Sequence, residues 1–261
     1  MSANQGFGQG IGLHGGHEGG QGLELERIDF AHGGAKRGER YVGRTPESGA
    51  LLLEQVSLRV PAGELVALNA PSGAGKSTLL RLAAFMLPAD SGTIRINGTA
   101  FGPGDRVPAA TRRQVGVVLQ SPRAAADPRL RLDALICAPL SFRDGFIRPR
   151  PRRHAGRLTE LMELVQLDPG LLRRFPHQVS DGQLQRAMVA RALALDPSVL
   201  ICDEPTAQLD AHTTGGILGI LAARAEAGTA VLLASHDRQA TAKVATSQVS
   251  LADINAAAPS G

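Results

Sequence analysis

The clearest chemical motif in the sequence is a glycine-rich loop of the type that binds phosphate. It follows the apolar run Leu65–Leu68 and consists of Ala70, Pro71, Ser72, Gly73, Ala74, Gly75, Lys76, Ser77 and Thr78. Glycines let backbone N–H groups converge on phosphate oxygens, and the start of the following helix adds positive potential. Lys76 would reach the terminal phosphates, and the Ser77 hydroxyl would bind Mg²⁺. Alanine replaces the usual glycine at position 70, which is harmless if Ala70 keeps a negative φ.

Two carboxylates follow a second apolar run. Val199–Cys202 predicts a buried strand, and Asp203 and Glu204 come directly after it. Ligands bind at the carboxyl ends of strands in open α/β sheets. We therefore expect Asp203 to hold a metal ion through water and Glu204 to polarise the water that attacks a γ-phosphate.

The elements that must position these groups indicate a single α/β domain. The 261 residues are 43% hydrophobic, which is enough for one substantial core. Alternating or continuous apolar residues predict strands over Leu23–Ile28, Glu54–Val60, Leu65–Leu68, Val199–Cys202 and Ala230–Ala234. Ser91–Gly98 ends in Asn-Gly, a hairpin signal, and helical spacing dominates residues 121–196. These patterns predict a mostly parallel core with an antiparallel element and a helical insertion.

The N-terminal segment and the charge pattern exclude several classes of protein. Residues 1–22 are mostly Gly and Gln, and we expect a disordered tail in which His14, His17 and Glu18 are flexible polar residues rather than metal ligands. The sequence contains neither a signal peptide nor the roughly 20 consecutive apolar residues of a membrane span, which predicts a soluble, cytoplasmic protein. Cys137 and Cys202 lie far apart in the sequence and are expected to be inert thiols.

Further motifs make the chain resemble the ABC (ATP-binding cassette) ATPases from residue 23 to residue 261. They appear in the order of that family: Gln120 as the Q-loop glutamine, Val179–Gln183 as the signature, Ala207–Asp210 as the D-loop and His236 as the switch histidine. The resemblance implies an α/β fold with a RecA-like P-loop NTPase core, an antiparallel β subdomain and an α-helical signature subdomain at about 121–196. It also implies ATP and Mg²⁺ as cofactors.

The same resemblance assigns roles to these residues. Gln120 would reach the metal ion and the attacking water, and His236 would contact the γ-phosphate. Ser180, Gly182 and Gln183 would lie across a dimer interface and cap the γ-phosphate held by the opposite subunit. Asp210, in the D-loop, would let the two sites sense each other.

The signature also has a local physical interpretation. Ser180 and Gln183 form a capping-box pattern at the start of a helix, whose orphan N–H groups favour a phosphate. Asp181 stands where the family has glycine and places a carboxylate close to the expected phosphate. We expect its charge to weaken closure of a dimer, so that Asp181→Gly would raise ATPase activity or tighten dimerisation.

The aromatic residue that stacks on adenine is less well defined by the sequence. Phe30 is our choice, and Tyr41 is the alternative because a Gly- and Arg-rich loop separates them. A Phe within the core is a competing interpretation of Phe30.

Within the family, the chain most resembles ATPase subunits of dipeptide, oligopeptide and nickel importers. The stretches that carry this likeness are Asp127–Leu130, Ala138–Leu140, Arg174–His177 and Phe30–Gly34. The resemblance implies separate permease subunits in the membrane, a homodimer or a heterodimer with a sister ATPase, a periplasmic or extracellular substrate-binding protein, and a place on the inner face of the cell membrane.

The alternative is a soluble ABC ATPase of a nucleic-acid-related or multi-enzyme complex. Only the basic stretch from Arg148 to Arg157 favours it. Such stretches are usually solvated, and we expect no nucleic-acid partner.

Overall fold

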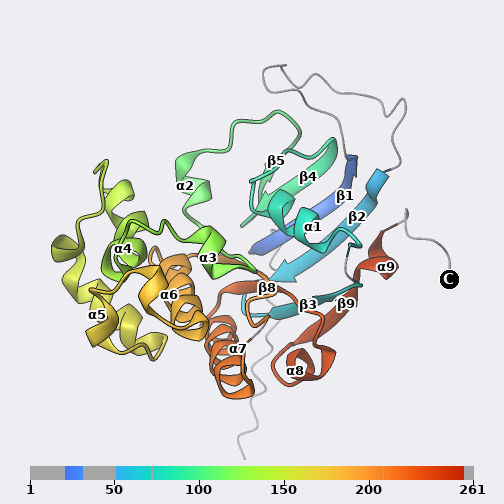
Figure 1. Cartoon of the computed structure of the whole chain (residues 1–261). Helices are drawn as coiled ribbons and strands as arrows, with labels where there is room; N and C mark the ends of the chain where they lie inside the picture. The colour runs from blue at the N-terminus through green and yellow to red at the C-terminus, as the bar shows by residue number, and fades with distance from the viewer. Residues whose placement is uncertain (1–20, 32–50, 72, 208, 256–261) are drawn as a thin grey trace, which may run out of the picture.

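Two β-sheets organise residues 21–31, 51–71, 73–207 and 209–255, which are the residues that the computed structural model describes (Figure 1). The antiparallel sheet has the order β2-β1-β4-β5, with β1 at Gly22–Ala31, β2 at Leu51–Pro61, β4 at Ser91–Ile96 and β5 at Thr99–Phe101. The parallel sheet has the order β6-β7-β8-β3-β9, with β3 at Leu65–Asn69, β6 at Val115–Val118, β7 at Val199–Asp203, β8 at Ala230–Ala234 and β9 at Ser247–Ser250. The predicted parallel core and antiparallel element are both present.

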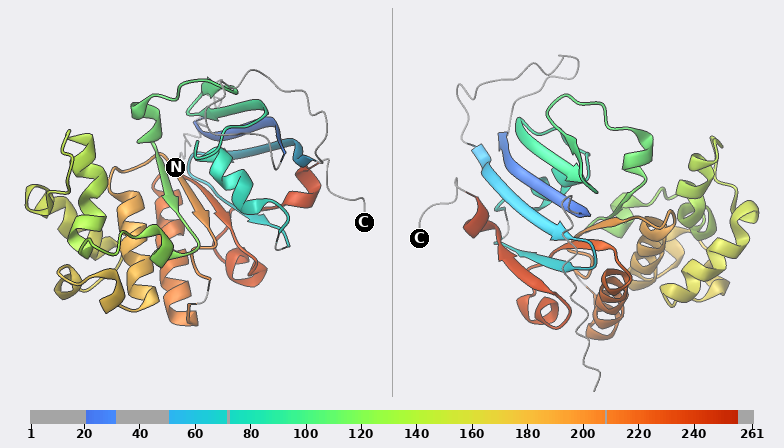
Figure 2. Two further views of the ribbon diagram at one scale, coloured as in Figure 1. Left: turned by 45° about the horizontal axis from the view of Figure 1, so that its top comes forward. Right: turned by 180° about the vertical axis from the view of Figure 1, so that it is seen from behind.

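All described regular structure between β6 and β7 is helical. It comprises α3 (Pro122–Ala125), α4 (Leu132–Arg143), η1 (Pro151–His154), α5 (Ala155–Leu164), η2 (Pro169–Leu171), η3 (Pro176–Gln178) and α6 (Asp181–Leu193). Figure 2 shows these helices gathered on the side of the molecule away from the antiparallel sheet. The other helices are α1 (Lys76–Ala83), α2 (Ala109–Arg112), α7 (Ala211–Glu226), α8 (Arg238–Ala242) and α9 (Leu251–Ile254). Among the helices that the structure describes, no candidate for a membrane span occurs.

The central strands β7, β8 and β3 of the parallel sheet are buried on both faces, which explains their continuous apolar residues. In β7, Val199 and Ile201 face a core that includes α1 and the antiparallel sheet. Leu200 and Cys202 face a second core that includes α4, α5, α6 and α7. Because alternate residues of one strand fill two cores, the carboxyl end of β7 is fixed from both sides.

The hairpin between β4 and β5 confirms the prediction from Asn-Gly. Asn97 and Gly98 have φ values of 48° and 81°, as a two-residue turn between twisted strands requires. Asn97 also joins the two sheets, because its Oδ1 accepts from the Gly22 N–H at 3.0 Å and its Nδ2 donates to Ser198 Oγ at 2.7 Å. Ser198 directly precedes β7.

Several boundaries differ from the sequence predictions. Gly22, the last residue of the range 1–22 expected to be a tail, already belongs to β1, and β2 begins at Leu51 rather than Glu54. Residues 1–20, with His14, His17 and Glu18, lie outside the described residues. The edge strand β9 was not predicted, because Ser-Gln-Val-Ser has no apolar run and its side chains are only half-buried or exposed.

Burial makes both thiols unreactive in the native protein. Cys137 and Cys202 are fully buried, and this burial raises the pKa of both thiols, most strongly that of Cys202. The reactive thiolate is therefore scarce as well as inaccessible. We predict that Ellman's reagent at pH 8 detects no rapidly reacting thiol in the native protein and two thiols after denaturation. A fast reaction under native conditions would contradict this packing.

Candidate functional site

The glycine-rich loop that is predicted to bind phosphate lies between β3 and α1. Ala70, Pro71, Gly73, Ala74 and Gly75 form the described part of the loop, Lys76, Ser77 and Thr78 form the first turn of α1, and Ser72 lies outside the described residues. Gly73 and Gly75 have φ values of 81° and 98°, which favour glycine. A Cβ at Gly75 would also lie 3.1 Å from Leu53 Cδ2, so the loop is pressed against β2.

Alanine at position 70 is accommodated without strain. Ala70 is not among the described residues with positive φ, and its side chain is buried in the core beside α1. The condition under which this substitution is harmless is therefore met.

Lys76 points back over the loop instead of into solvent. Its side chain is only 6% exposed, and its Nζ donates to the Ala70 carbonyl and, at 3.3 Å, to the Pro71 carbonyl. The same Nζ lies 3.7 Å from Glu204 Oε1. The ammonium is thus held between the phosphate-binding loop and the carboxylate that follows β7.

Three polar side chains from distant parts of the sequence contact the carboxylate of Glu204. Besides Lys76, its Oε2 lies 3.0 Å from His236 Nδ1 and 3.5 Å from Gln120 Nε2. The backbone of Glu204 has a φ of 44°, which is unfavourable for a residue with a side chain by about 1–3 kcal/mol. Its N–H donates to the Ala234 carbonyl at 2.9 Å, which fixes this turn against β8.

Sheet order explains why these groups converge. β6, β7, β8 and β3 are consecutive parallel neighbours, so their carboxyl ends lie along one edge. Gln120 follows β6, Glu204 follows β7, His236 follows β8 and the phosphate-binding loop follows β3. The sequence predicted each residue separately, and this edge brings them together.

Asp203 differs from Glu204 in its surroundings. It is the last residue of β7 and is 5% exposed, and its Oδ1 is buried without a hydrogen-bond partner among the described residues. A buried carboxylate oxygen without a partner is unfavourable, so this atom is suited to a cation or water.

The signature begins α6 with the capping box that the sequence indicates. Ser180 Oγ accepts from the Gln183 N–H at 3.2 Å, and Gln183 Oε1 accepts from the Ser180 N–H at 3.0 Å. A Cβ at Gly182 would lie 2.9 Å from Thr213 Cγ2, which favours glycine where α6 meets α7. Within the described residues, no hydrogen bond or ion pair joins Ser180, Gly182 or Gln183 to the phosphate-binding loop or to Glu204.

Asp181 forms an ion pair that the sequence did not indicate. Its Oδ1 lies 2.6 Å from Arg123 Nε, and both side chains are about half exposed. Sequence reasoning missed Arg123 because no local pattern links α3 to the start of α6.

Asp210 caps α7. Its Oδ1 accepts from the Thr213 N–H at 2.9 Å and its Oδ2 from the Thr213 hydroxyl at 2.7 Å, and these hydrogen bonds hold the pKa of the carboxyl below its usual range. The carboxylate thus fixes the start of α7, which follows Ala207 and Leu209 in the chain. Gln208 lies outside the described residues.

Phe30 lies in β1 opposite Leu53 of β2 and is partly buried against the core between the sheets. Leu53 in turn contacts the position of Gly75, so Phe30 is on the strand next to the one that supports the loop. The alternative aromatic, Tyr41, lies outside the described residues.

Two import ATP-binding proteins are similar in sequence to this chain. A putative peptide import ATP-binding protein of Brucella abortus is 40% identical over 202 residues, which are 75% of this chain and 60% of the relative. A nickel import ATP-binding protein of the same species is 37% identical over 196 residues, which are 74% of this chain and 73% of the relative. The chain thus spans less than two thirds of the length of the peptide import relative.

A solved structure confirms the predicted fold. The dimeric structure of the ATP-binding cassette MJ0796, in a post-hydrolysis state bound to ADP and Pi, superposes with a TM-score of 0.71 at 25% identity, over 87% of this chain and 93% of that chain. The sequence profile described as ABC transporter matches residues 53–207, more than half of the chain. This chain therefore belongs to the ABC transporter family.

Proposed function

We propose that this chain binds ATP with Mg²⁺ and hydrolyses it as one half of a nucleotide-sandwich dimer that powers an importer. The convergence of Lys76, Gln120 and His236 on Glu204 is the observation that carries this proposal. This arrangement supports a role for Lys76 as the cation for phosphate, for Glu204 as the base, and for Gln120 and His236 as orienting groups.

ATP would enter with its phosphates on the loop Ala70–Thr78. Backbone N–H groups of the loop and the first turn of α1 bind the α- and β-phosphates, and Lys76 turns from the loop carbonyls to the β- and γ-phosphates. Phe30 is our proposed contact for adenine, because it lies beside the strand that supports Gly75.

The oxygen groups near the loop fit Mg²⁺, which prefers carboxylate, hydroxyl and amide oxygens. The unpartnered Oδ1 of Asp203 is the strongest indication, and the Ser77 hydroxyl and the Gln120 amide complete the set that we propose. When bound, the ion neutralises charge that develops on the phosphates.

Glu204 would act as the general base. Its carboxylate accepts a proton from the attacking water, while His236, held at 3.0 Å from Oε2, keeps the carboxylate in place and faces the γ-phosphate. Ser180, Gly182 and Gln183 would complete the site of the opposite subunit, since among the described residues no hydrogen bond or ion pair joins them to the loop of their own chain. Asp210, as the cap of α7, would position the D-loop between the two sites.

The names of the relatives support import of a peptide or nickel through separate permease subunits. In such a system the chain would lie at the inner face of the membrane, pair with itself or a sister ATPase, and serve a substrate-binding protein outside the cell.

The structure gives no support to a nucleic-acid role for the basic stretch. Arg150 and Arg153 lie 5.7 and 5.3 Å from the centre of the Phe146 ring, and Arg157 pairs with Glu160 at 2.9 Å. These side chains are engaged within their own subdomain.

Replacement of the proposed base, Glu204, should block ATP hydrolysis without preventing ATP binding. We predict that Glu204→Gln lowers the rate of phosphate release about 100-fold or more, because general-base catalysis contributes at least this much, while ATP still binds. Phosphate release and equilibrium binding of ATP measure the two steps. The matched control Glu226→Gln, at the exposed end of α7, should keep the full rate. A Glu204→Gln protein with normal turnover would exclude Glu204 as the base.

If a second chain completes each site, the ATPase activity depends on protein concentration. We predict that the ATPase rate per chain of purified protein rises with concentration in the dilute range, because monomers lack the signature contacts of a partner. Steady-state phosphate release over a dilution series measures this. A rate per chain that stays constant would show that one chain suffices.

The importer assignment is tested by the partners of the native protein. We expect permease subunits to copurify with the chain from mildly solubilised membranes, with identification by mass spectrometry. Recovery of soluble proteins or nucleic acid alone would contradict the transport function and leave the ATPase intact.

A further inference from the structure

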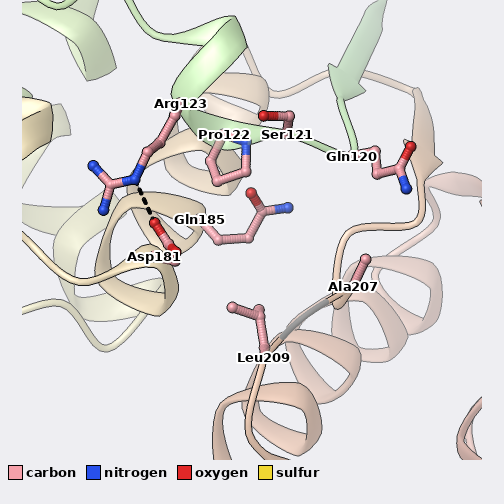
Figure 3. A pocket seen from close by; sticks show the side chains of 8 residues that line it. All are labelled: Gln120, Ser121, Pro122, Arg123, Asp181, Gln185, Ala207 and Leu209. Atoms are coloured by element: carbon pink, nitrogen blue, oxygen red, sulfur yellow. Dashed lines mark ion pairs between the residues drawn. The ribbon is translucent and has the colours of Figure 1, made fainter.

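Arg123 connects the segment after Gln120 with the start of the signature helix. It lies in α3, and each nitrogen of its guanidinium group has one partner on the chain that leads into α6. Nε lies 2.6 Å from Asp181 Oδ1, Nη1 donates to the Pro176 carbonyl at 3.0 Å and Nη2 donates to the Val179 carbonyl at 3.2 Å. Figure 3 shows Arg123 reaching across to Asp181 at the rim of a pocket of about 230 Å³.

Asp181 brings a negative charge to the start of α6. Asp181 is the first residue of α6 and follows the cap Ser180, so its carboxylate lies beside the helix N-terminus. A carboxylate is favourable there in an isolated helix. In the proposed sandwich, however, the same N-terminus meets the γ-phosphate of the opposite subunit, and like charges repel.

We propose that Arg123 is a positioning residue that neutralises Asp181 and thereby allows α6 to accept the partner's γ-phosphate. Arg123 acts through Asp181 and does not contact the nucleotide itself. This inference rests on the proposed function, because it needs a signature that works across a dimer.

The first turn of α6 has supports that do not involve Arg123. The Ser180–Gln183 capping box holds the turn, and the buried Gln185 donates from Nε2 to the Pro205 carbonyl at 2.8 Å. Pro205 directly follows Glu204, so this bond ties α6 to the loop after the proposed base. We therefore expect the helix to stay in place when the charge of Arg123 is removed, and the main effect to be electrostatic.

The test measures ATP-driven dimerisation of the full chain with Glu204→Gln, which blocks hydrolysis. Sedimentation over a range of protein concentrations, with ATP and Mg²⁺, gives the dimer dissociation constant. We expect Arg123→Gln in this background to weaken dimerisation about tenfold or more, because it exposes the charge of Asp181 to the opposite phosphate. Arg123→Lys, which keeps the charge, should lose much less.

A second change distinguishes charge from structure. Asp181→Asn should restore dimerisation of the Arg123→Gln protein to within about threefold of the Glu204→Gln parent, because coupled residues show non-additive effects. ATP binding to the monomer should be unaffected in all these variants. Arg129→Gln is the matched control, since among the described residues Arg129 pairs with Asp127 alone and its side chain is 85% exposed.

Each contrary result has a separate meaning. Equal dimerisation with and without Arg123→Gln would overturn the inference and leave the sandwich standing. A loss that Asp181→Asn does not restore would show that Arg123 holds the Pro176 and Val179 carbonyls and does not compensate charge, which also overturns it. No ATP-driven dimer in the Glu204→Gln parent would exclude a sandwich of two copies of this chain, and the inference with it.

Discussion

The site depends on one carboxylate, that of Glu204, and on the edge of the parallel sheet that presents it. Lys76, Gln120 and His236 come from three other strand ends and reach Glu204 only because β6, β7, β8 and β3 are consecutive neighbours. The positive φ of Glu204 is unfavourable, and the hydrogen bond from its N–H to Ala234 holds the chain in this turn. The packing of β7 between two cores thus supports the local strain at Glu204, the base that we propose.

The same packing connects the site to the rest of the molecule. The core beside α1 fixes the phosphate-binding loop against β2, and the core on the other face fixes α6, which carries the signature. Gln185 and Arg123 then tie the first turn of α6 to the segments that follow Glu204 and Gln120. A movement of either segment would therefore shift the start of α6, which lies at the surface where we propose that a second chain binds.

Local patterns allowed much of this to be predicted from the sequence. The phosphate-binding loop, the Asn97-Gly98 turn and the Ser180–Gln183 capping box each depend on residues a few positions apart. The ion pair of Arg123 with Asp181 depends on tertiary packing, and no spacing rule indicates it. β9 was missed because an edge strand needs no apolar face, and Phe30 stayed ambiguous because core packing and adenine stacking favour the same residue type.

The central claim, that each site combines the loop of one chain with the signature of another, is tested most directly by mixing two inactive variants. Lys76→Ala removes the cation that we propose for phosphate binding, and Ser180→Glu places a negative charge where the opposite phosphate would bind. Mixed dimers of these variants contain one intact composite site, so random pairing should restore up to about a quarter of the ATPase activity of the unmodified protein. Recovery of activity on mixing is the predicted result. If the mixture stays as inactive as its components although mixed dimers form, the site is not shared between chains.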